Sequence, residues 1–135
     1  MSALAFTVAV IETRPLRIHA WLHHLPPAED PVLVPRPFAP IGLFVAVTIR
    51  DAAGADIFHT EQPKVRLKLD PSEPGSYVAL DAGATYGAIL DVPAPALPPG
   101  RYALHATYSN HQFAGPAGRE FGPLAFEAAA RFEVS

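Results

Sequence analysis

Apolar and polar positions alternate along most of this chain, and a period of two residues predicts β-strands rather than helices. The segment after Pro15 shows the pattern well, because every second residue is apolar and the residues between them are polar or aromatic. One face of this strand would carry Leu16, Ile18, Ala20 and Leu22, and the other Arg17, His19, Trp21 and His23. Comparable patterns predict strands over residues 3–11, 43–49, 56–58, 65–69, 77–80, 85–92, 101–108 and 126–134.

Proline and glycine separate the predicted strands. The chain has 16 prolines in 135 residues, more than double the average usage of about 5%. Because a proline inside a helix costs about 3 kcal/mol, there is little room for long helices. Six prolines fall within residues 25–40, which we expect to form an extended loop without a strand, since proline cannot donate to a ladder. We expect glycine to complete tight turns at residues 51–54 and 81–83.

Short strands separated by frequent turns define the expected fold. Seven to nine strands, with turns about every ten residues, predict an all-β, antiparallel β-sandwich of immunoglobulin-like topology, with a small barrel as the alternative. No repeat or linker divides residues 1–135, so we expect one domain. Tyr102 follows the Pro99-Gly100 corner and is expected to tie that corner through its hydroxyl. The chain has no cysteine, so packing alone would hold the two sheets together.

Three short motifs follow one another in the C-terminal half. They are Leu80-Asp-Ala-Gly83-Ala-Thr-Tyr86, then Pro99-Gly100-Arg-Tyr102, then Phe121-Gly122-x-Leu124 with Phe132-x-Val134. In this order they resemble the turn and core positions of bacterial immunoglobulin-like domains, which occur in surface proteins, protease accessory domains and intracellular proteinase-inhibitor-like proteins. The likeness covers less than half of the chain and consists of turn glycines and core tyrosines. It therefore implies a fold and no particular activity.

Charge and hydropathy exclude several classes of function. The net charge is −3, and among the ten basic residues only Lys64, Arg66 and Lys68 cluster, a pattern that we interpret as protection of a strand edge. We therefore expect no nucleic-acid binding. The apolar run 3–11 is too short to span a membrane and lacks the flanks of a signal peptide. The chain favours a cytoplasmic location, and a periplasmic one would require an export signal that has been removed.

The sequence lacks the usual signatures of catalysis. It contains no Gly-x-Ser-x-Gly, His-Glu-x-x-His, Walker or Gly-x-Gly-x-x-Gly motif. All five serines fall in predicted loops or at the termini. We therefore expect a protein that is not an enzyme, with no catalytic residues and no cofactor.

Two histidines flank the single tryptophan on one strand face. His19 and His23 would lie on the same side of the strand, separated by Trp21, and residues two apart on a strand are about 6–7 Å apart. Two such imidazoles can share a metal ion, and a third ligand would have to come from His105, His111 or Glu120. The alternatives are a plain solvated face, a core position for Trp21, or a face that binds a protein partner, since tryptophan is a common hot-spot residue.

Two long loops are the other candidate binding region, because rigid sandwiches carry binding residues on loops. Phe38 in residues 25–40 and Phe113, with His111, in residues 109–123 are candidate contacts for a protein partner, unless both rings fold onto the core. The sequence thus predicts a binding or interaction module. The alternatives are a proteinase-inhibitor-like protein that inserts residues 25–40 into a protease, and a metal-binding protein. Exposed strands would also allow homo-oligomers.

Overall fold

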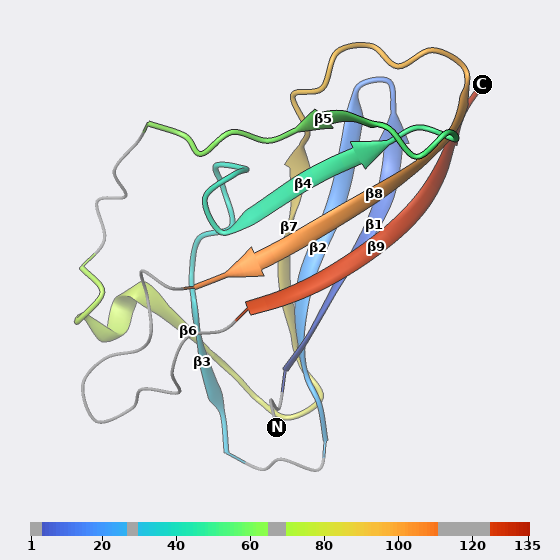
Figure 1. Ribbon diagram of the computed structural model, residues 1–135. Coiled ribbons are helices and arrows are strands. Elements are labelled where there is room, and N and C mark those ends of the chain that lie inside the picture. Colours follow the sequence, from blue (N-terminus) through green and yellow to red (C-terminus); the bar gives the residue numbers. More distant parts are fainter. Residues whose placement is uncertain (1–3, 27–29, 65–69, 111–124) are drawn as a thin grey trace.

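Nine strands form the part of the chain that the computed structural model describes, residues 4–26, 30–64, 70–110 and 125–135 (Figure 1). The strands are β1 (Leu4–Thr13), β2 (Leu16–His24), β3 (Val32–Pro35), β4 (Val45–Arg50), β5 (Asp56–His59), β6 (Tyr77–Leu80), β7 (Thr85–Asp91), β8 (Gly100–Ser109) and β9 (Ala125–Val134). A single 3-10 turn, Pro74–Ser76, precedes β6. The prediction of an all-β protein is confirmed.

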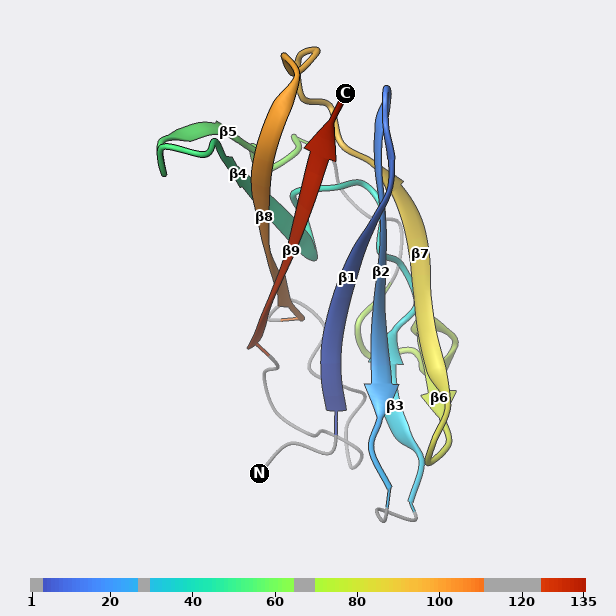
Figure 2. The same ribbon diagram turned by 90° about the vertical axis from the view of Figure 1, so that its right-hand side faces the viewer.

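The strands pair antiparallel and form two layers (Figure 2). One layer contains the three-stranded sheet β1-β2-β7, and the other contains the four-stranded sheet β5-β4-β8-β9. The two-stranded sheet β3-β6 lies on the same side of the core as β7 in Figure 2. The architecture is therefore an antiparallel β-sandwich, as the spacing of strands and turns predicts.

The alternation in the sequence becomes the division between core and surface. On β2, the residues from Leu16 to His24 at every second position are buried, and those between them are partly or fully exposed. The same alternation on β4 and β8 supplies the opposite wall. Tyr108 lies between the layers, with four phenylalanine rings at centroid distances of 5.7–6.4 Å, namely Phe6, Phe38, Phe44 and Phe126.

The proline-rich segment 25–40 contains a strand, so the prediction of a loop without one is wrong there. Val32 to Pro35 pairs with β6, with Val34 opposite Val78 and Pro35 opposite Tyr77. Three apolar residues in a row, two of them valines, favour the extended conformation, and the prolines lie only at the ends of this run. Because the sheet has only two strands, proline at the end of β3 interrupts no second ladder.

Tyrosine hydroxyls tie the proline-rich connections to the sandwich. Tyr102 donates a hydrogen bond to the carbonyl oxygen of Pro98 at 2.5 Å, which confirms the predicted corner. In the same way, Tyr77 donates to Pro71 and Tyr86 donates to Arg36, at 2.6 and 2.5 Å. The three connections that contain Arg36, Pro71 and Pro98 are thus each fixed to a strand by one hydrogen bond.

The two predicted glycine turns are present. Gly54 and Gly83 have φ angles of +85° and +84°, the left-handed region that glycine adopts without steric cost. At the first turn the carboxylate of Asp51 also accepts hydrogen bonds from the amides of Ala53 and Ala55, at 2.9 and 3.0 Å. The predicted strand 65–69, with Arg66 and Lys68 of the basic cluster, lies outside the described residues.

Candidate functional site

The outer surface of the sheet β1-β2-β7 carries no lysine, arginine, aspartate or glutamate over three consecutive rows. The register aligns Ala5, His23 and Thr85 in one row, Thr7, Trp21 and Gly87 in the next, and Ala9, His19 and Ile89 in the third. We call these nine residues the Trp21 face. Lys, Arg, Asp and Glu are absent from it, and the ion pair of Arg17 with Asp91, at 2.7 Å, lies beyond its third row.

Trp21 belongs to this outer surface, so the alternative that places it in the core is wrong. Trp21 is partly exposed, and its ring packs against the ring of His19 in a tilted arrangement, with centroids 4.5 Å apart and planes inclined by 34°. Ile89, in the next row on β7, is 62% exposed. An aromatic ring and a large aliphatic side chain therefore lie together at the surface of a rigid sheet.

Gly87 allows β7 to approach β2 closely beside Trp21. A Cβ atom at position 87 would lie 2.1 Å from the carbonyl oxygen of Ala20 and 2.5 Å from the Cβ of Trp21. Both distances are far below van der Waals contact, so any other residue here would displace one of the two strands. The sequence offered no sign of this requirement, because it depends on how closely two distant segments approach.

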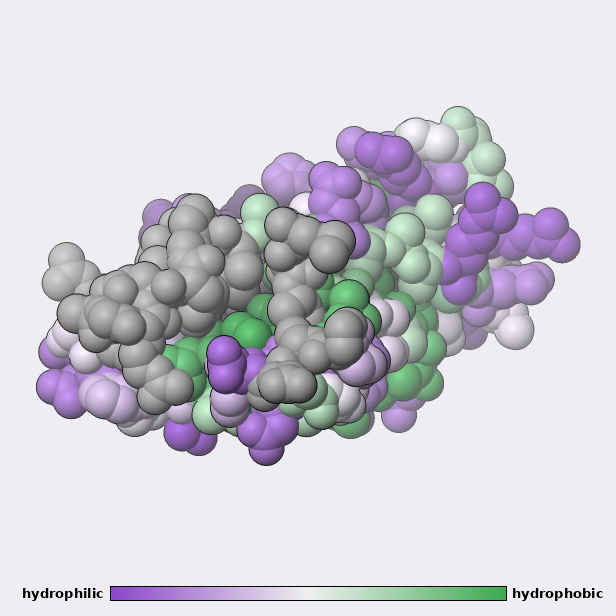
Figure 3. Space-filling model, turned by 90° about the horizontal axis from the view of Figure 1, so that it is seen from below, coloured by the Kyte–Doolittle hydropathy of each residue, from purple (hydrophilic) through white to green (hydrophobic). Residues whose placement is uncertain are grey.

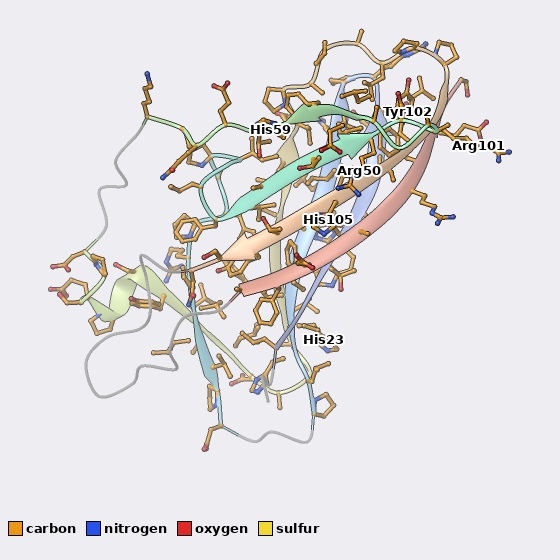
Figure 4. The ribbon with its side chains drawn as sticks, in the orientation of Figure 1. His23, Arg50, His59, Arg101, Tyr102 and His105 are labelled. Carbon is orange, nitrogen blue, oxygen red and sulfur yellow. The ribbon has the colours of Figure 1, made fainter. Side chains whose placement is uncertain are left out.

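The histidines do not assemble into a metal site within the described residues. His19 and His23 share the outer face of β2 as predicted, but no group of three His, Asp or Glu side chains placed to hold a metal ion occurs in the described ranges. The proposed third ligand His105 lies on the other sheet, on β8 (Figure 4). The remaining candidates, His111 and Glu120, lie outside the described residues.

His24 faces the core and not the predicted metal site. It is fully buried, and its Nδ1 lies 2.8 Å from the carbonyl oxygen of Leu80. Its Nε2 has no hydrogen-bond partner in the part of the chain that the structure describes. This side chain links the end of β2 to the end of β6 and has no access to solvent.

Phe38 is part of the core, which corrects its prediction as an exposed contact for a partner. It is 3% exposed, and its ring centroid lies 5.7 Å from those of Tyr86 and Tyr108. Burial among aromatic rings removes its apolar surface from water, which is more favourable than leaving it on a loop. Phe113 and His111 lie outside the described residues.

The segment that would enter a protease is held against the sandwich. The guanidinium of Arg36 donates hydrogen bonds to the carbonyl oxygens of Gly75 and Tyr77, at 3.1 and 3.2 Å. The backbone carbonyl oxygen of Arg36 accepts a hydrogen bond from the hydroxyl of Tyr86. These bonds fix the part of the segment that follows β3.

Other surfaces differ in character from the Trp21 face. At the lower end of the sandwich, hydrophobic residues reach the surface (Figure 3), and Leu25, directly after β2, is 39% exposed. The outer face of the four-stranded sheet is charged, with Arg50 paired to Asp56 at 2.7 Å and Nε2 of His105 3.9 Å from a carboxylate oxygen of Glu127 (Figure 4).

Comparison of the chain with protein-family models, with curated proteins and with solved structures finds no match. None of the described residues belongs to a helix with the length and hydropathy that a membrane crossing requires. The chemistry of the surface is therefore the basis for assigning a function.

Proposed function

We propose that this protein is a non-enzymatic binding module that binds another protein through the Trp21 face. The observation that carries the proposal is the contrast between the two outer surfaces. The Trp21 face has three rows without Lys, Arg, Asp or Glu, whereas three arginines and three carboxylates of the described strands lie on the opposite face. Interface centres are depleted in charge and enriched in aromatic residues, and tryptophan dominates their energetics.

The position of Trp21 supports this role. It lies in the middle row of the face, with Thr7 on one side and Gly87 on the other. These small neighbours leave room for a partner's side chains beside the ring. Because Trp21 lies on the central strand of the sheet, little conformational freedom is lost when it is covered, which favours binding.

We also propose that the sandwich belongs to the immunoglobulin-like class. Two features support this: the glycine turn at 81–83 joins β6 to β7, and the hydroxyl of Tyr102 ties the corner that leads into β8. Both occur where the resemblance to bacterial immunoglobulin-like domains would place them. In such domains rigid sheets and their loops present binding surfaces for other proteins.

Site-directed photo-crosslinking tests the proposed function. Benzoylphenylalanine is introduced at Ile89 on the Trp21 face, or at Ala129 on the outer face of the other sheet as the control position. Expression in the source cells should give a discrete adduct with another protein only from position 89. An adduct of equal yield from both positions, or an adduct only with a second copy of this chain, would contradict the proposal.

The identified partner is then purified and its affinity is measured for three versions of the chain. Trp21→Ala should weaken binding by about 30-fold, which corresponds to a hot-spot loss of about 2 kcal/mol. Thr107→Ala on the opposite face should leave the affinity unchanged. Circular dichroism melting shows whether both variants are folded. An unchanged affinity in a folded Trp21→Ala variant refutes the assignment of this face.

A further inference from the structure

Arginines from three adjacent strands surround Ala103 on the outer face of the four-stranded sheet. Arg50 on β4 and Arg131 on β9 lie directly opposite Ala103 on either side. Arg101 precedes Ala103 by two residues on β8, so its side chain starts on the same face. Residues directly opposite each other have Cβ atoms about 5 Å apart, and diagonal neighbours such as Arg101 and Arg131 are about 7 Å apart, a separation that two arginine side chains can bridge.

Two of these arginines form no ion pair with any of the residues that the structure describes. Arg50 is paired with Asp56 at 2.7 Å, but in the described parts of the chain no carboxylate lies within 4 Å of the guanidinium of Arg101 or Arg131. Glu133 lies opposite Arg101 in the register and still forms no ion pair with it. Two arginine side chains without an ion pair therefore lie on neighbouring strands, beside the carboxylate of Glu133.

The surface is hollowed around this pair. One depression, with a volume of about 350 Å³, is lined by Asp51, Ala52, Arg101, Tyr102, Ala103 and Arg131. An adjoining one of about 390 Å³ is lined by Arg101, Tyr102, Arg131, Phe132 and Glu133. In Figure 4 Arg101 projects outward from the end of the sheet, and His105 lies farther along β8.

The strands beneath the hollows are rigid, and they are supported from the core side. The hydroxyl of Tyr102 is bonded to the carbonyl oxygen of Pro98, and its ring stacks on Phe132 with centroids 5.4 Å apart. β8 is paired on both sides over this region. The backbone from which Arg101 and Arg131 project is therefore preorganised, and only their side chains need to be ordered by a ligand.

We propose that Arg101 and Arg131 form a binding site for a doubly charged tetrahedral oxyanion, either phosphate or the phosphoryl group of a small ester. Each guanidinium can bind two oxygens of one such group, so two guanidiniums on neighbouring strands can together offset its charge. The carboxylates nearby, at Asp51, Asp56 and Glu133, disfavour a longer polyanion such as nucleic acid. The site lies on the layer opposite the Trp21 face and is independent of the proposed protein binding.

A titration followed by ¹H–¹⁵N NMR spectra tests this site. Sodium phosphate is added at constant ionic strength, with sodium chloride as the balancing salt. The amides of Arg101 and Ala103 should shift in a saturable way with a Kd of about 1 mM, which corresponds to about −4 kcal/mol. Sulfate, with the same shape and charge, should produce similar shifts, and chloride should not.

Two variants separate a specific site from general attraction of anions. In the double variant Arg101→Gln/Arg131→Gln the affinity for phosphate should fall at least about tenfold, a loss that two charge-assisted contacts easily account for. Arg14→Gln, an exposed arginine between β1 and β2, is the matched control and should bind as the wild type does. The NMR spectra themselves show whether each variant is folded.

Methyl phosphate distinguishes the two sources of the oxyanion. Equal affinities for phosphate and methyl phosphate would assign the site to phosphoryl groups of esters as well as the free ion, because the open hollows leave room for the ester carbon. Binding of phosphate alone would assign it to the free ion. Shifts that do not saturate, that chloride reproduces, or that persist in the double variant would overturn the proposal.

Discussion

Tyr102 and Tyr108 lie on the same face of β8, but their hydroxyl groups have opposite environments. The hydroxyl of Tyr102 donates to the carbonyl oxygen of Pro98 at 2.5 Å. The hydroxyl of Tyr108 is buried and has no hydrogen-bond partner among the described residues. Substitution of each tyrosine by phenylalanine removes the same atom, so the two variants should change stability in opposite directions.

The expected magnitudes follow from the cost of lost and unmade hydrogen bonds. Tyr102→Phe removes one hydrogen bond and should lower the free energy of unfolding by about 1 kcal/mol. A buried hydroxyl without a partner costs about 1–3 kcal/mol. Tyr108→Phe removes that cost and should raise the free energy of unfolding by about 1 kcal/mol, after allowance for the small void that the oxygen leaves.

Urea denaturation measures both changes directly. The fluorescence of Trp21, the only tryptophan in the chain, reports unfolding, and circular dichroism provides a second probe of the same transition. The denaturant slopes of the variants should match that of the wild type, so that the shifts in midpoint reflect stability alone. The two midpoints should lie on opposite sides of the wild-type value.

A loss of about 1 kcal/mol or more in Tyr108→Phe would refute this reasoning. It would mean that the hydroxyl of Tyr108 makes a favourable bond in the folded protein. A loss in Tyr102→Phe of less than about 0.3 kcal/mol would show that water replaces the corner bond without cost. Either result would change the account of how the tyrosines stabilise this sandwich.

Three further predictions concern pH, strand approach and turn stability. Burial, with a smaller contribution from nearby Tyr86, raises the pKa of Tyr108. Above pH 10 the folded chain therefore keeps the phenol proton that the unfolded chain loses, so the folded state becomes less stable as the pH rises. Urea titrations should show that the free energy of unfolding of the wild type falls by about 1.4 kcal/mol more than that of Tyr108→Phe between pH 9 and pH 11. Gly87→Ala should lower the free energy of unfolding by about 2–3 kcal/mol, because the Cβ atom of the alanine would lie 2.1 Å from a backbone oxygen of β2. An unchanged midpoint in thermal melting would contradict the close approach of the two strands. Asp51→Ala should lower the free energy of unfolding by about 1 kcal/mol, because the Asp51 carboxylate accepts hydrogen bonds from two backbone amides of its turn. The control Asp81→Ala, in the second turn, should change the melting midpoint little. Equal losses in the two variants would contradict a role for the side-chain bonds.

Local chemistry was sufficient to predict most of the described strands, though not β3, and several of their contacts. The period of two identified β2 and placed His19, Trp21 and His23 together on one face, because side-chain direction alternates along any strand. The turn at Gly54 and the bond from Tyr102 to its corner involve residues only a few positions apart. Features of this kind depend on backbone sterics and short-range bonds, which the order of residues specifies directly.

Contacts between distant segments depended on the register and on the approach of the two layers. The prolines around β3 concealed its pairing with β6, and the buried position of Phe38 follows from a space that several strands enclose. Arg101 and Arg131 are isolated basic residues in the sequence, yet strand pairing brings them to one hollow. Period and composition determine which side of a strand a residue occupies, whereas its neighbours across the sheet are set by long-range packing that only the folded chain possesses.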